Sequence, residues 1–338
     1  MKIAFLNIYQ DKVGRGAETF VTELSKRLSK NNKVDVISQD KTIPKRVPVL
    51  WKLFLDPQGL MIFWFTFKNI PRILKEKYDI VVSLNGGWQP AIIRIVTWLY
   101  GGKTIISGQS GIGWDDRNNL WCFPDAFVAL SSKALSWAKK AMPIVKSFYI
   151  PNGVDLERFK PQGEKFNTKL IKPIVLAVGA FTEQKRMDLV IKAVARLKRV
   201  SLLIVGGAGD LKEKLTVEGK RLLDDRFEVM SVPFTEMPKV YRVADIFTLP
   251  SASSEAFGNV LVEAMASGLP VIATNDPIRR EIVGDAGVLV DPTNTNEYMA
   301  ALQKALNTNW EGKPRKRAEN FSWDEIAKKY EGLFKNIK

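Results

Sequence analysis

The chain has 338 residues, enough for two domains of ordinary size, and its 46% hydrophobic and 26% charged content is that of a soluble globular protein. It contains no histidine, which excludes histidine metal ligands, histidine general bases and every Ser–His or Cys–His nucleophile pair. A single cysteine, Cys122, excludes an intramolecular disulfide and fits a reducing compartment.

The net charge of +15 is unevenly distributed. Residues 1–150 contain 22 Lys or Arg and 11 Asp or Glu, whereas residues 151–338 contain 29 and 25. A basic N-terminal half suggests an anionic partner, such as a membrane surface, a phosphorylated lipid or nucleic acid. A basic surface that only keeps the protein soluble would explain the same excess. Because no nucleic-acid-binding module is recognisable, we expect no nucleic acid partner.

Short apolar runs alternate with helical patterns along the whole chain. In the first half we expect strands at residues 3–8, 34–38, 79–84, 104–107, 126–130 and 147–150, and helices at 17–29, 59–75, 89–100 and 131–141. In the second half we expect strands at residues 174–178, 202–205, 227–232, 246–249, 271–273 and 288–290, and helices at 187–199, 211–223, 236–243, 259–267, 276–283 and 296–306. Continuously apolar strands, each followed by a helix, are typical of parallel sheets covered on both faces. The sequence therefore predicts an α/β protein with two doubly wound, Rossmann-like domains.

The sequence has few features that indicate membrane association. Lys2 leads directly into the first strand, so no signal peptide is recognisable, and the apolar run at residues 60–67 is too short for a membrane span. We expect a cytoplasmic protein, either free or at the cytoplasmic face of a membrane. The aromatic residues 63–67 lie among lysines and arginines, so they could contact a membrane interface as a peripheral site. A buried core helix over residues 61–74 is the favoured alternative.

The stretch from Ser254 to Pro270 carries the strongest functional signal. It lies between two apolar runs that indicate buried strands, and its middle has helical periodicity. Glu255 therefore precedes a helix entrance at Gly258, and Glu263 lies about two turns inside the helix. A helix N-terminus offers free N–H groups to a phosphate, and two carboxylates can accept hydrogen bonds from sugar or ribose hydroxyls. This pattern suggests a sugar nucleotide, although two glutamates on a solvated helix face would look the same.

Three further glycine-containing turns follow expected strands. In residues 14–18 a glycine pair opens a helix, and Gly16 would let a ligand approach the backbone. Lys185 and Arg186 end the loop after the strand at 174–178 and could neutralise a leaving diphosphate. The turn that begins at Gly206 could line a nucleotide. Each turn could equally connect its two elements without a ligand, and the first does not match a dinucleotide-binding fingerprint.

These motifs together resemble those of the family 4 retaining glycosyltransferases (glycosyl transferases group 1), and the resemblance covers nearly the whole chain. The segments that carry it are residues 14–18, 150–155, 178–188, 203–209, 251–274 and 322–323. The family has the GT-B fold, in which two Rossmann-like domains face each other across a cleft and the last helix crosses back to the N-terminal domain. The resemblance implies an acceptor-binding domain over residues 1–152 with 322–338, and a donor-binding domain over residues 153–321.

The resemblance also implies a role for individual residues. Glu255 would hold hydroxyls of the transferred sugar and Lys185 the diphosphate, so these two are the expected catalytic residues. Glu263 would bind the ribose, Val232 falls where the family places the base, and Gly16 would approach the donor phosphates. The donor-binding set implied in this way is Gly16, Lys185, Arg186, Gly206, Val232, Glu255, Phe257, Gly258, Asn259, Val260 and Glu263.

The chain departs from the family pattern in two places. Ala180 stands where the family usually has an arginine on the diphosphate, and Arg186 is a candidate substitute from a different position. The family's histidine in the N-terminal domain is absent, and either an amide or a hydroxyl takes its place, neither of which is a base at neutral pH. The adjacent aspartates further on could orient the acceptor or form a solvated turn or helix cap. The acceptor-binding candidates are thus Gln109, Ser110, Asp115 and Asp116.

The activity implied by the resemblance is a retaining hexosyl transfer from a UDP- or GDP-linked sugar to a glycan or a lipid-linked acceptor, as in polysaccharide or glycolipid synthesis. In the front-face mechanism proposed for the family, the leaving phosphate oxygen takes the acceptor proton. We therefore expect no histidine base, no metal and no cofactor. The alternatives are a catalytically impaired nucleotide-sugar-binding protein of the same fold and an NAD(P)-dependent oxidoreductase.

Overall fold

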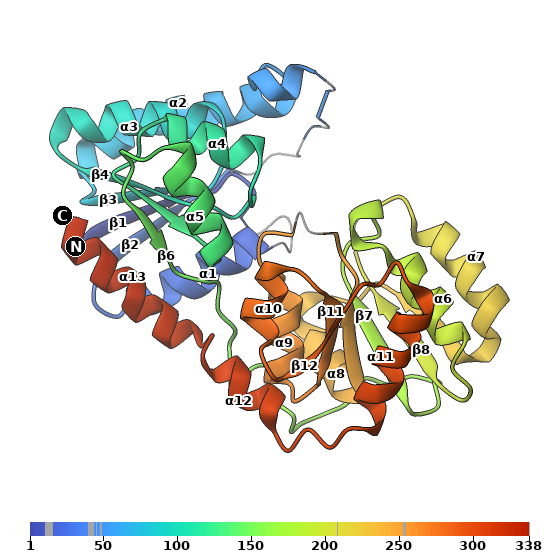
Figure 1. Ribbon diagram of the computed structural model, residues 1–338. Coiled ribbons are helices and arrows are strands. Elements are labelled where there is room, and N and C mark those ends of the chain that lie inside the picture. The colour runs from blue at the N-terminus through green and yellow to red at the C-terminus, as the bar shows by residue number, and fades with distance from the viewer. Residues whose placement is uncertain are drawn as a thin grey trace. The chain divides into compact units, whose positions relative to one another are not determined.

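The computed structural model describes residues 1–10, 16–39, 44, 46, 47, 49–207, 209–252 and 255–337 (Figure 1). Contacts within the chain divide it into two compact units. The first consists of Met1–Asn152 with Trp323–Lys338, and the second of Gly153–Ser322. The chain therefore leaves the first unit after Asn152 and returns to it with its last helix.

The first unit contains a six-stranded parallel sheet of order β2-β1-β3-β4-β5-β6. Its strands are β1 (Lys2–Leu6), β2 (Lys33–Ile37), β3 (Ile80–Ser83), β4 (Lys103–Ser107), β5 (Ala126–Ala129) and β6 (Ser147–Tyr149). The strands β3 and β5 are buried at every position and consist mainly of Val, Ile, Phe and Ala. Burial at successive positions means that both faces of the sheet are covered.

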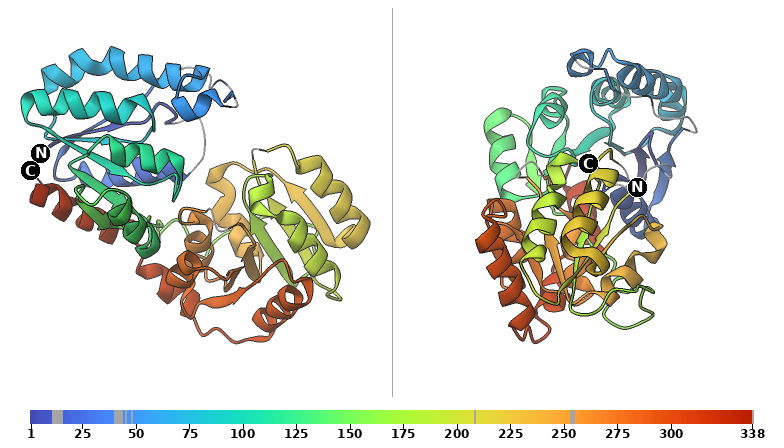
Figure 2. Two further views of the ribbon diagram at one scale, coloured as in Figure 1. Left: turned by 45° about the horizontal axis from the view of Figure 1, so that its top comes forward. Right: turned by 90° about the vertical axis from the view of Figure 1, so that its right-hand side faces the viewer.

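Helices cover the two faces of this sheet (Figures 1 and 2). One face carries α1 (Gly16–Leu28) and α13 (Trp323–Ile337), where the ring of Phe20 contacts those of Trp323 and Tyr330. The other face carries α2 (Pro57–Glu76), α3 (Trp88–Tyr100), α4 (Trp114–Trp121) and α5 (Ser132–Ala141), and the 3-10 turn η1 (Leu50–Leu53) precedes α2. Asp56 begins α2 as its N-cap, accepting a hydrogen bond of 3.0 Å from the Gly59 amide.

The second unit contains another six-stranded parallel sheet, of order β12-β11-β10-β7-β8-β9. Its strands are β7 (Ile174–Val178), β8 (Ser201–Val205), β9 (Phe227–Met230), β10 (Ile246–Leu249), β11 (Val271–Thr274) and β12 (Gly287–Val290). The chain moves from β7 outward to β8 and β9, then crosses back to β10, on the other side of β7. The carboxyl ends of β7 and β10 therefore form the point where the strand order reverses, the usual place of a ligand site in such sheets.

Helices on both faces complete the second unit. The side chains of α6 (Met187–Ala195), α7 (Lys212–Leu223) and α11 (Thr295–Asn307) form one core with the sheet. The opposite face carries α8 (Met237–Val243), α9 (Asn259–Ala266), α10 (Pro277–Val283) and α12 (Lys313–Glu319). The 3-10 turns η2 (Glu183–Lys185), η3 (Asp224–Arg226) and η4 (Phe234–Glu236) lie in its loops.

The predicted fold class is confirmed, because both units are parallel sheets with helices on both faces. Two helices, α4 and α12, were not predicted from the sequence, because both are short and polar and lack a continuous apolar stripe. The strand predicted at 227–232 ends at Met230, so Val232 lies in the following loop. Residues 61–74 lie within α2, where Ile62 and Phe65 are buried, as a core helix predicts. Trp64 and Phe67 are exposed, and their contact with a membrane stays a prediction.

Candidate functional site

The polar residues of the second unit converge on the loops that follow β7 and β10. The loop after β7 contains η2 and ends at Arg186, and the loop after β10 runs from Pro250 to the start of α9. Because β10 is hydrogen-bonded to β7, two segments far apart in sequence lie side by side at this edge of the sheet.

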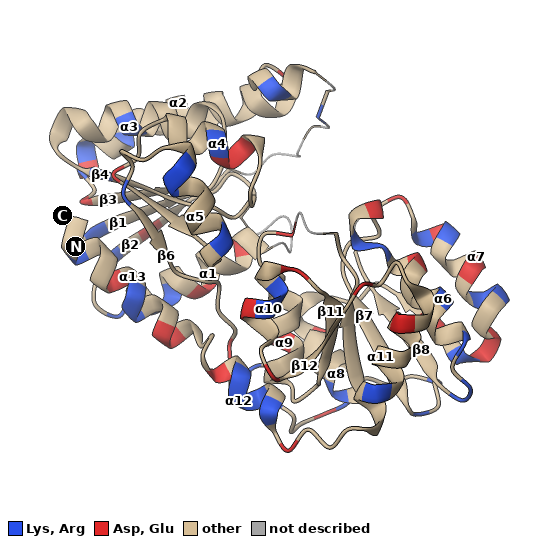
Figure 3. Cartoon of the chain, viewed as in Figure 1, with Lys and Arg blue, Asp and Glu red and all other residues tan. Residues whose placement is uncertain are grey.

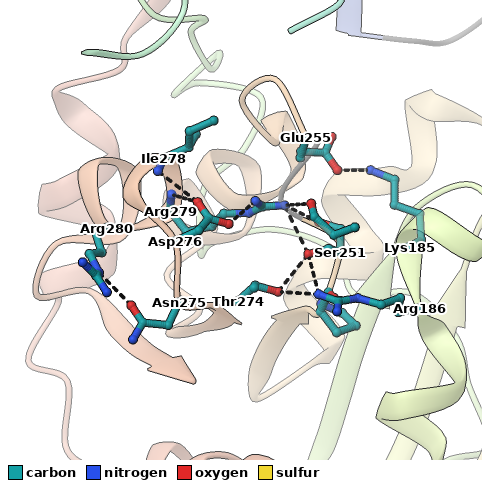
Figure 4. A network of polar contacts seen from close by, with 12 residues as sticks. Lys185, Arg186, Ser251, Glu255, Thr274, Asn275, Asp276, Ile278, Arg279 and Arg280 are labelled. Atoms are coloured by element: carbon teal, nitrogen blue, oxygen red, sulfur yellow. Dashed lines mark hydrogen bonds and ion pairs between the residues drawn. The ribbon is translucent and has the colours of Figure 1, made fainter. Parts of the chain in front are cut away.

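The two predicted catalytic residues form an ion pair (Figure 4). Nζ of Lys185 lies 2.5 Å from Oε2 of Glu255, and their side chains are 19% and 21% exposed. Both charges are therefore close to solvent but mostly shielded from it. Partial burial strengthens the attraction of each group for a ligand of opposite charge or for a hydroxyl. The structure thus brings together the two residues expected to carry the chemistry.

Glycines at the strand ends leave room for this pair. The side-chain carbons Cγ and Cδ of Lys185 pass so close to Gly179 that a Cβ atom there would lie 3.2–3.3 Å from them. A Cβ atom on Gly206 would overlap the carbonyl oxygen of Gly179 and lie 2.8 Å from the ring of Phe181. The absence of a side chain at Gly206 therefore allows the ends of β7 and β8 to pack closely. Its role as a nucleotide contact stays a prediction.

Arg186 binds the neighbouring loop. Its Nε donates to the carbonyl oxygen of Pro250 at 2.7 Å, and its Nη2 donates to that of Ser251 at 2.9 Å and to Oγ1 of Thr274 at 3.3 Å. Gln184 adds a backbone hydrogen bond, accepting from the Ala252 amide at 2.8 Å. In this structure Arg186 thus orders the loop that carries Glu255. To bind a diphosphate as well, its guanidinium would have to share these hydrogen bonds with the phosphate oxygens.

A second arginine, which the sequence did not single out, holds the same loop from α10. Arg279 is fully buried, and its guanidinium pairs with the carboxylate of Asp276. Nη2 of Arg279 donates to Oγ of Ser251 at 2.6 Å and to the carbonyl oxygen of Ala252 at 3.0 Å. Asp276 also caps α10 by accepting from the amides of Ile278 and Arg279. A buried arginine that binds backbone carbonyls fixes their position.

One sequence signal could have found Arg279. It lies three and four residues before Ile282 and Val283, so it stands on the apolar face of its helix, where a charge must have a buried partner. Asp276, three residues earlier, is the only acidic residue within one turn on its N-terminal side. The sequence could not show that the guanidinium would reach across to the loop after β10.

The entrance of α9 lies beside the ion pair. Gly258 is the N-cap residue with φ of 96°, a conformation that favours glycine, and it has no side chain to cap the first turn of Asn259 and Val260. Phe257 is 2% exposed, and its ring packs against Phe321. Phe257 could therefore meet a ligand only through its backbone, and its role in donor binding stays a prediction. The first-turn amides and the positive end of the helix suit a phosphate group.

Glu263 is more deeply placed than Glu255. Its side chain is 7% exposed, and its Oε2 accepts a hydrogen bond of 2.8 Å from the hydroxyl of Tyr241. Burial raises the pKa of Glu263 to about 7 and also raises the pKa of Tyr241. Glu263 and Tyr241 thus form a buried acidic pair in the second unit, and a role in ribose binding stays a prediction.

The first unit contains Gly16 and the acceptor candidates. Gly16 begins α1, whereas Gly14 and Arg15 lie outside the described residues. Gln109 and Asn152 exchange two hydrogen bonds of 3.0 Å between their side-chain amides, and Ser110 is exposed. Gln109 therefore fixes the end of β4 to the last residue before the second unit.

Asp115 and Asp116 lie in the first turn of α4. Asp116 is 2% exposed, accepts from Nδ2 of Asn119 at 3.2 Å, and its pKa is raised by burial to about 8. Burial also raises the pKa of Asp115, whose Oδ1 is buried without a hydrogen-bond partner among the described residues. The alternative of a solvated turn is wrong for Asp116, because it is buried, and the acceptor role of Asp115 stays a prediction.

Metal ligation and membrane crossing find no support in the described residues. Acidic and cysteine side chains there form no group of three or more that could hold a metal ion. In the same part of the chain, no helix is both long and apolar enough to cross a bilayer.

Comparisons with known proteins agree with this geometry. The whole chain resembles solved structures of the GT-B class: sucrose-phosphate synthase from Thermosynechococcus elongatus (TM-score 0.77, 21% identity, 99% of this chain and 98% of that one) and Anabaena HepE in complex with UDP and glucose (TM-score 0.76, 18% identity, 99% and 100%). The fold and the loops at its switch point thus define a GT-B, Rossmann-like protein.

Residues 159–323 match the family model "Glycosyl transferases group 1", and residues 14–158 match "Glycosyltransferase Family 4". The chain belongs to the group 1, family 4 glycosyltransferases.

Several curated relatives match between half and two thirds of the chain. The phosphatidyl-myo-inositol mannosyltransferase of Mycolicibacterium smegmatis is 29% identical over 231 residues, which cover 62% of this chain and 57% of the relative. The chain spans about half the length of this relative and of two other curated relatives that it matches.

Proposed function

We propose that the protein is a retaining glycosyltransferase that moves a hexose from a UDP- or GDP-linked donor to a glycan or lipid-linked acceptor. The observation that carries the proposal is the Lys185–Glu255 ion pair beside the N-terminus of α9, at the switch point of the second sheet. A cation and a helix entrance suit the charged diphosphate of a sugar nucleotide, and a carboxylate beside them suits the sugar hydroxyls.

The proposed mechanism depends on positioning and on the stabilisation of negative charge. Donor binding inserts the diphosphate and sugar at the Lys185–Glu255 pair, so that the ammonium binds phosphate oxygens and the carboxylate accepts sugar hydroxyls. As the glycosidic bond to phosphate breaks, Lys185 and the α9 amides stabilise the departing charge. The acceptor oxygen attacks the same face of the sugar and gives its proton to the leaving phosphate oxygen. No step needs a histidine or a metal ion.

The carboxylates proposed to orient the acceptor come from the first unit. Among the described residues, Oδ1 of Asp115 is buried without a hydrogen-bond partner, and Gln109 and Ser110 follow β4. These polar groups suit the hydroxyls of a sugar or of an inositol headgroup, and the name of the Mycolicibacterium relative refers to phosphatidyl-myo-inositol. The basic excess of residues 1–150 supports peripheral contact of this unit with an anionic membrane, at its cytoplasmic face.

A thermal-shift screen of UDP- and GDP-linked sugars tests donor binding first. A ligand that binds only the folded state raises the unfolding temperature, so one nucleotide series should stabilise the chain and the other should not. A nicotinamide cofactor should have no effect, which would exclude the oxidoreductase alternative. No shift with any nucleotide sugar would contradict the proposal.

Hydrolysis of the stabilising donor tests catalysis. A retaining enzyme should release the sugar with the anomeric configuration of the donor, which proton NMR distinguishes within the first turnovers. Binding without hydrolysis or transfer would favour the impaired nucleotide-sugar-binding protein, for which Ala180 and the missing histidine are the supporting observations. Release of the inverted anomer would contradict the retaining mechanism.

A further inference from the structure

The first unit exposes large apolar side chains on α2 and α3. On α3 the exposed fractions are 61% for Ile95, 72% for Trp98 and 64% for Leu99. On α2 they are 56% for Trp64 and 51% for Phe67. Single exposed apolar residues are ordinary, but a contiguous group of them marks an interaction site.

These residues lie on two helices that pack against each other. Leu60, Trp64 and Phe67 recur at helical spacing on α2, and Ile95, Trp98 and Leu99 recur in the same way on α3. The two helices pack side by side (Figures 1 and 2), and a ring contact of 5.9 Å between Phe63 and Trp88 connects them. We call the surface made by Leu60, Trp64, Phe67, Ile95, Trp98 and Leu99 the α2–α3 apolar face.

The charges of these helices are mainly basic. They comprise Lys68, Arg72, Lys75, Arg94 and one acidic residue, Glu76, which ends α2 and pairs with Lys2 and Lys33. Arg94 is paired with Asp125 at 2.8 Å, whereas Lys68 and Lys75 are exposed. In Figure 3 both helices are uncharged along most of their length. A partner that is apolar at its centre and negatively charged at its edge would therefore suit the exposed Lys68 and Lys75.

We propose that the α2–α3 apolar face inserts into the interfacial layer of an anionic lipid bilayer. The inference rests on the membrane contact in the proposed function. It states that insertion of apolar side chains, rather than charge alone, determines binding to the membrane. Tryptophan suits the interface because its ring is apolar while its N–H remains hydrated, and lysines at the edge of the face can meet anionic headgroups. A second copy fits less well, because a two-fold contact would bring Lys68 and Lys75 beside the same lysines of the other copy.

Flotation of the full chain with lipid vesicles tests the proposal. The chain should float with vesicles of phosphatidylcholine and phosphatidylglycerol at low salt. Trp98→Ser combined with Leu99→Ser should lower the partition coefficient by about tenfold or more, because two large side chains no longer leave water. The matched control is Ile171→Ser with Val217→Ser, two positions of the second unit that are 77% and 69% exposed, and it should float like the parent chain.

A spectroscopic measurement separates insertion from a loss of folding. Trp98→Phe keeps an apolar ring, so it should still float, but brominated phosphatidylcholine should quench less of its tryptophan fluorescence than that of the parent chain. If the parent chain does not float, both the inference and the membrane contact are wrong, whereas donor hydrolysis stays as proposed. If the Trp98→Ser, Leu99→Ser chain floats normally, only the inference is wrong. A change of oligomeric state in that variant, without a change in flotation, would identify the face as a contact between copies.

Discussion

Arg186 and Arg279 donate hydrogen bonds to the same carbonyl oxygen, that of Ser251, at 2.9 and 3.4 Å. Arg186 reaches it from the end of the loop after β7, and Arg279 reaches it from α10 (Figure 4). The loop that carries Glu255 is therefore held on two sides before any ligand arrives. Such preorganisation limits the reorganisation needed when charge develops at a site.

The buried Arg279–Asp276 pair should contribute strongly to folding. Arg279→Met leaves the Asp276 carboxylate buried without its cation, and removal of one partner of a buried pair costs about 3–5 kcal/mol. Urea unfolding followed by circular dichroism should show a lower midpoint. Adding Asp276→Asn should restore part of the loss, because asparagine still caps α10 and carries no charge. Arg280→Met, at the adjacent exposed position, is the matched control and should leave the midpoint unchanged.

Lys185 and Glu255 should act on turnover rather than on folding. Lys185→Ala and Glu255→Ala should each lower the rate of donor hydrolysis by about a hundred- to a thousandfold, the usual effect of removing one group that stabilises charge or positions the sugar. Lys192→Ala removes a cation from the exposed pair with Asp188 and serves as the control. Full activity in either the Lys185 or the Glu255 variant would contradict the assignment of the site.

The contact between the β7 and β8 ends should tolerate no side chain at Gly206. Gly206→Ala should cost about 1–3 kcal/mol of unfolding free energy, because the added Cβ overlaps the Gly179 carbonyl. A Cβ atom on Gly207 would meet no other atom within 4 Å, so Gly207→Ala should be nearly neutral. Equal unfolding midpoints for the two variants would show that the strand ends can separate freely.

Nucleotide binding should depend on pH through Glu263. Burial raises the pKa of Glu263 to about 7, so the carboxyl is protonated below that pH and ionised above it. An ionised carboxylate accepts hydrogen bonds from both ribose hydroxyls, and affinity should therefore rise several-fold as the pH increases through about 7. Calorimetric titration with UDP or GDP, whichever stabilises the chain, measures this. Glu263→Gln should abolish the pH dependence, and Tyr241→Phe should move its midpoint upward, because the hydrogen bond from Tyr241 lowers the pKa of Glu263.

The same carboxyl should affect stability in the opposite sense. An unfolded glutamate ionises near pH 4.5, whereas the folded one keeps its proton to about 7. The folded state therefore binds more protons between these values, and the unfolding free energy contributed by Glu263 should fall as the pH rises across this window. Glu263→Gln should unfold with a weaker dependence on pH there. An identical pH dependence in both chains would show that Glu263 is not the group that titrates.

The arrangement of strands and helices could be predicted because it depends on local patterns. Runs such as residues 174–178 and 246–249 are apolar at every position, and only a strand covered on both faces suits them. The helix entrance at Gly258 and the carboxylates on either side of it were likewise evident, because glycine and glutamate positions are properties of the chain itself.

The partners of the site side chains were decided by the tertiary structure. Lys185 and Glu255 lie 70 residues apart, and they meet only because the sheet places β10 next to β7, although β8 and β9 intervene in the sequence. The tertiary structure likewise gives Arg186 and Arg279 a common acceptor in Ser251 and buries Glu263 against Tyr241. The sequence by itself determined which residues could bind a phosphate or a hydroxyl. The strand order decided which of them share a site, because hydrogen bonds and burial depend on distance in space rather than along the chain.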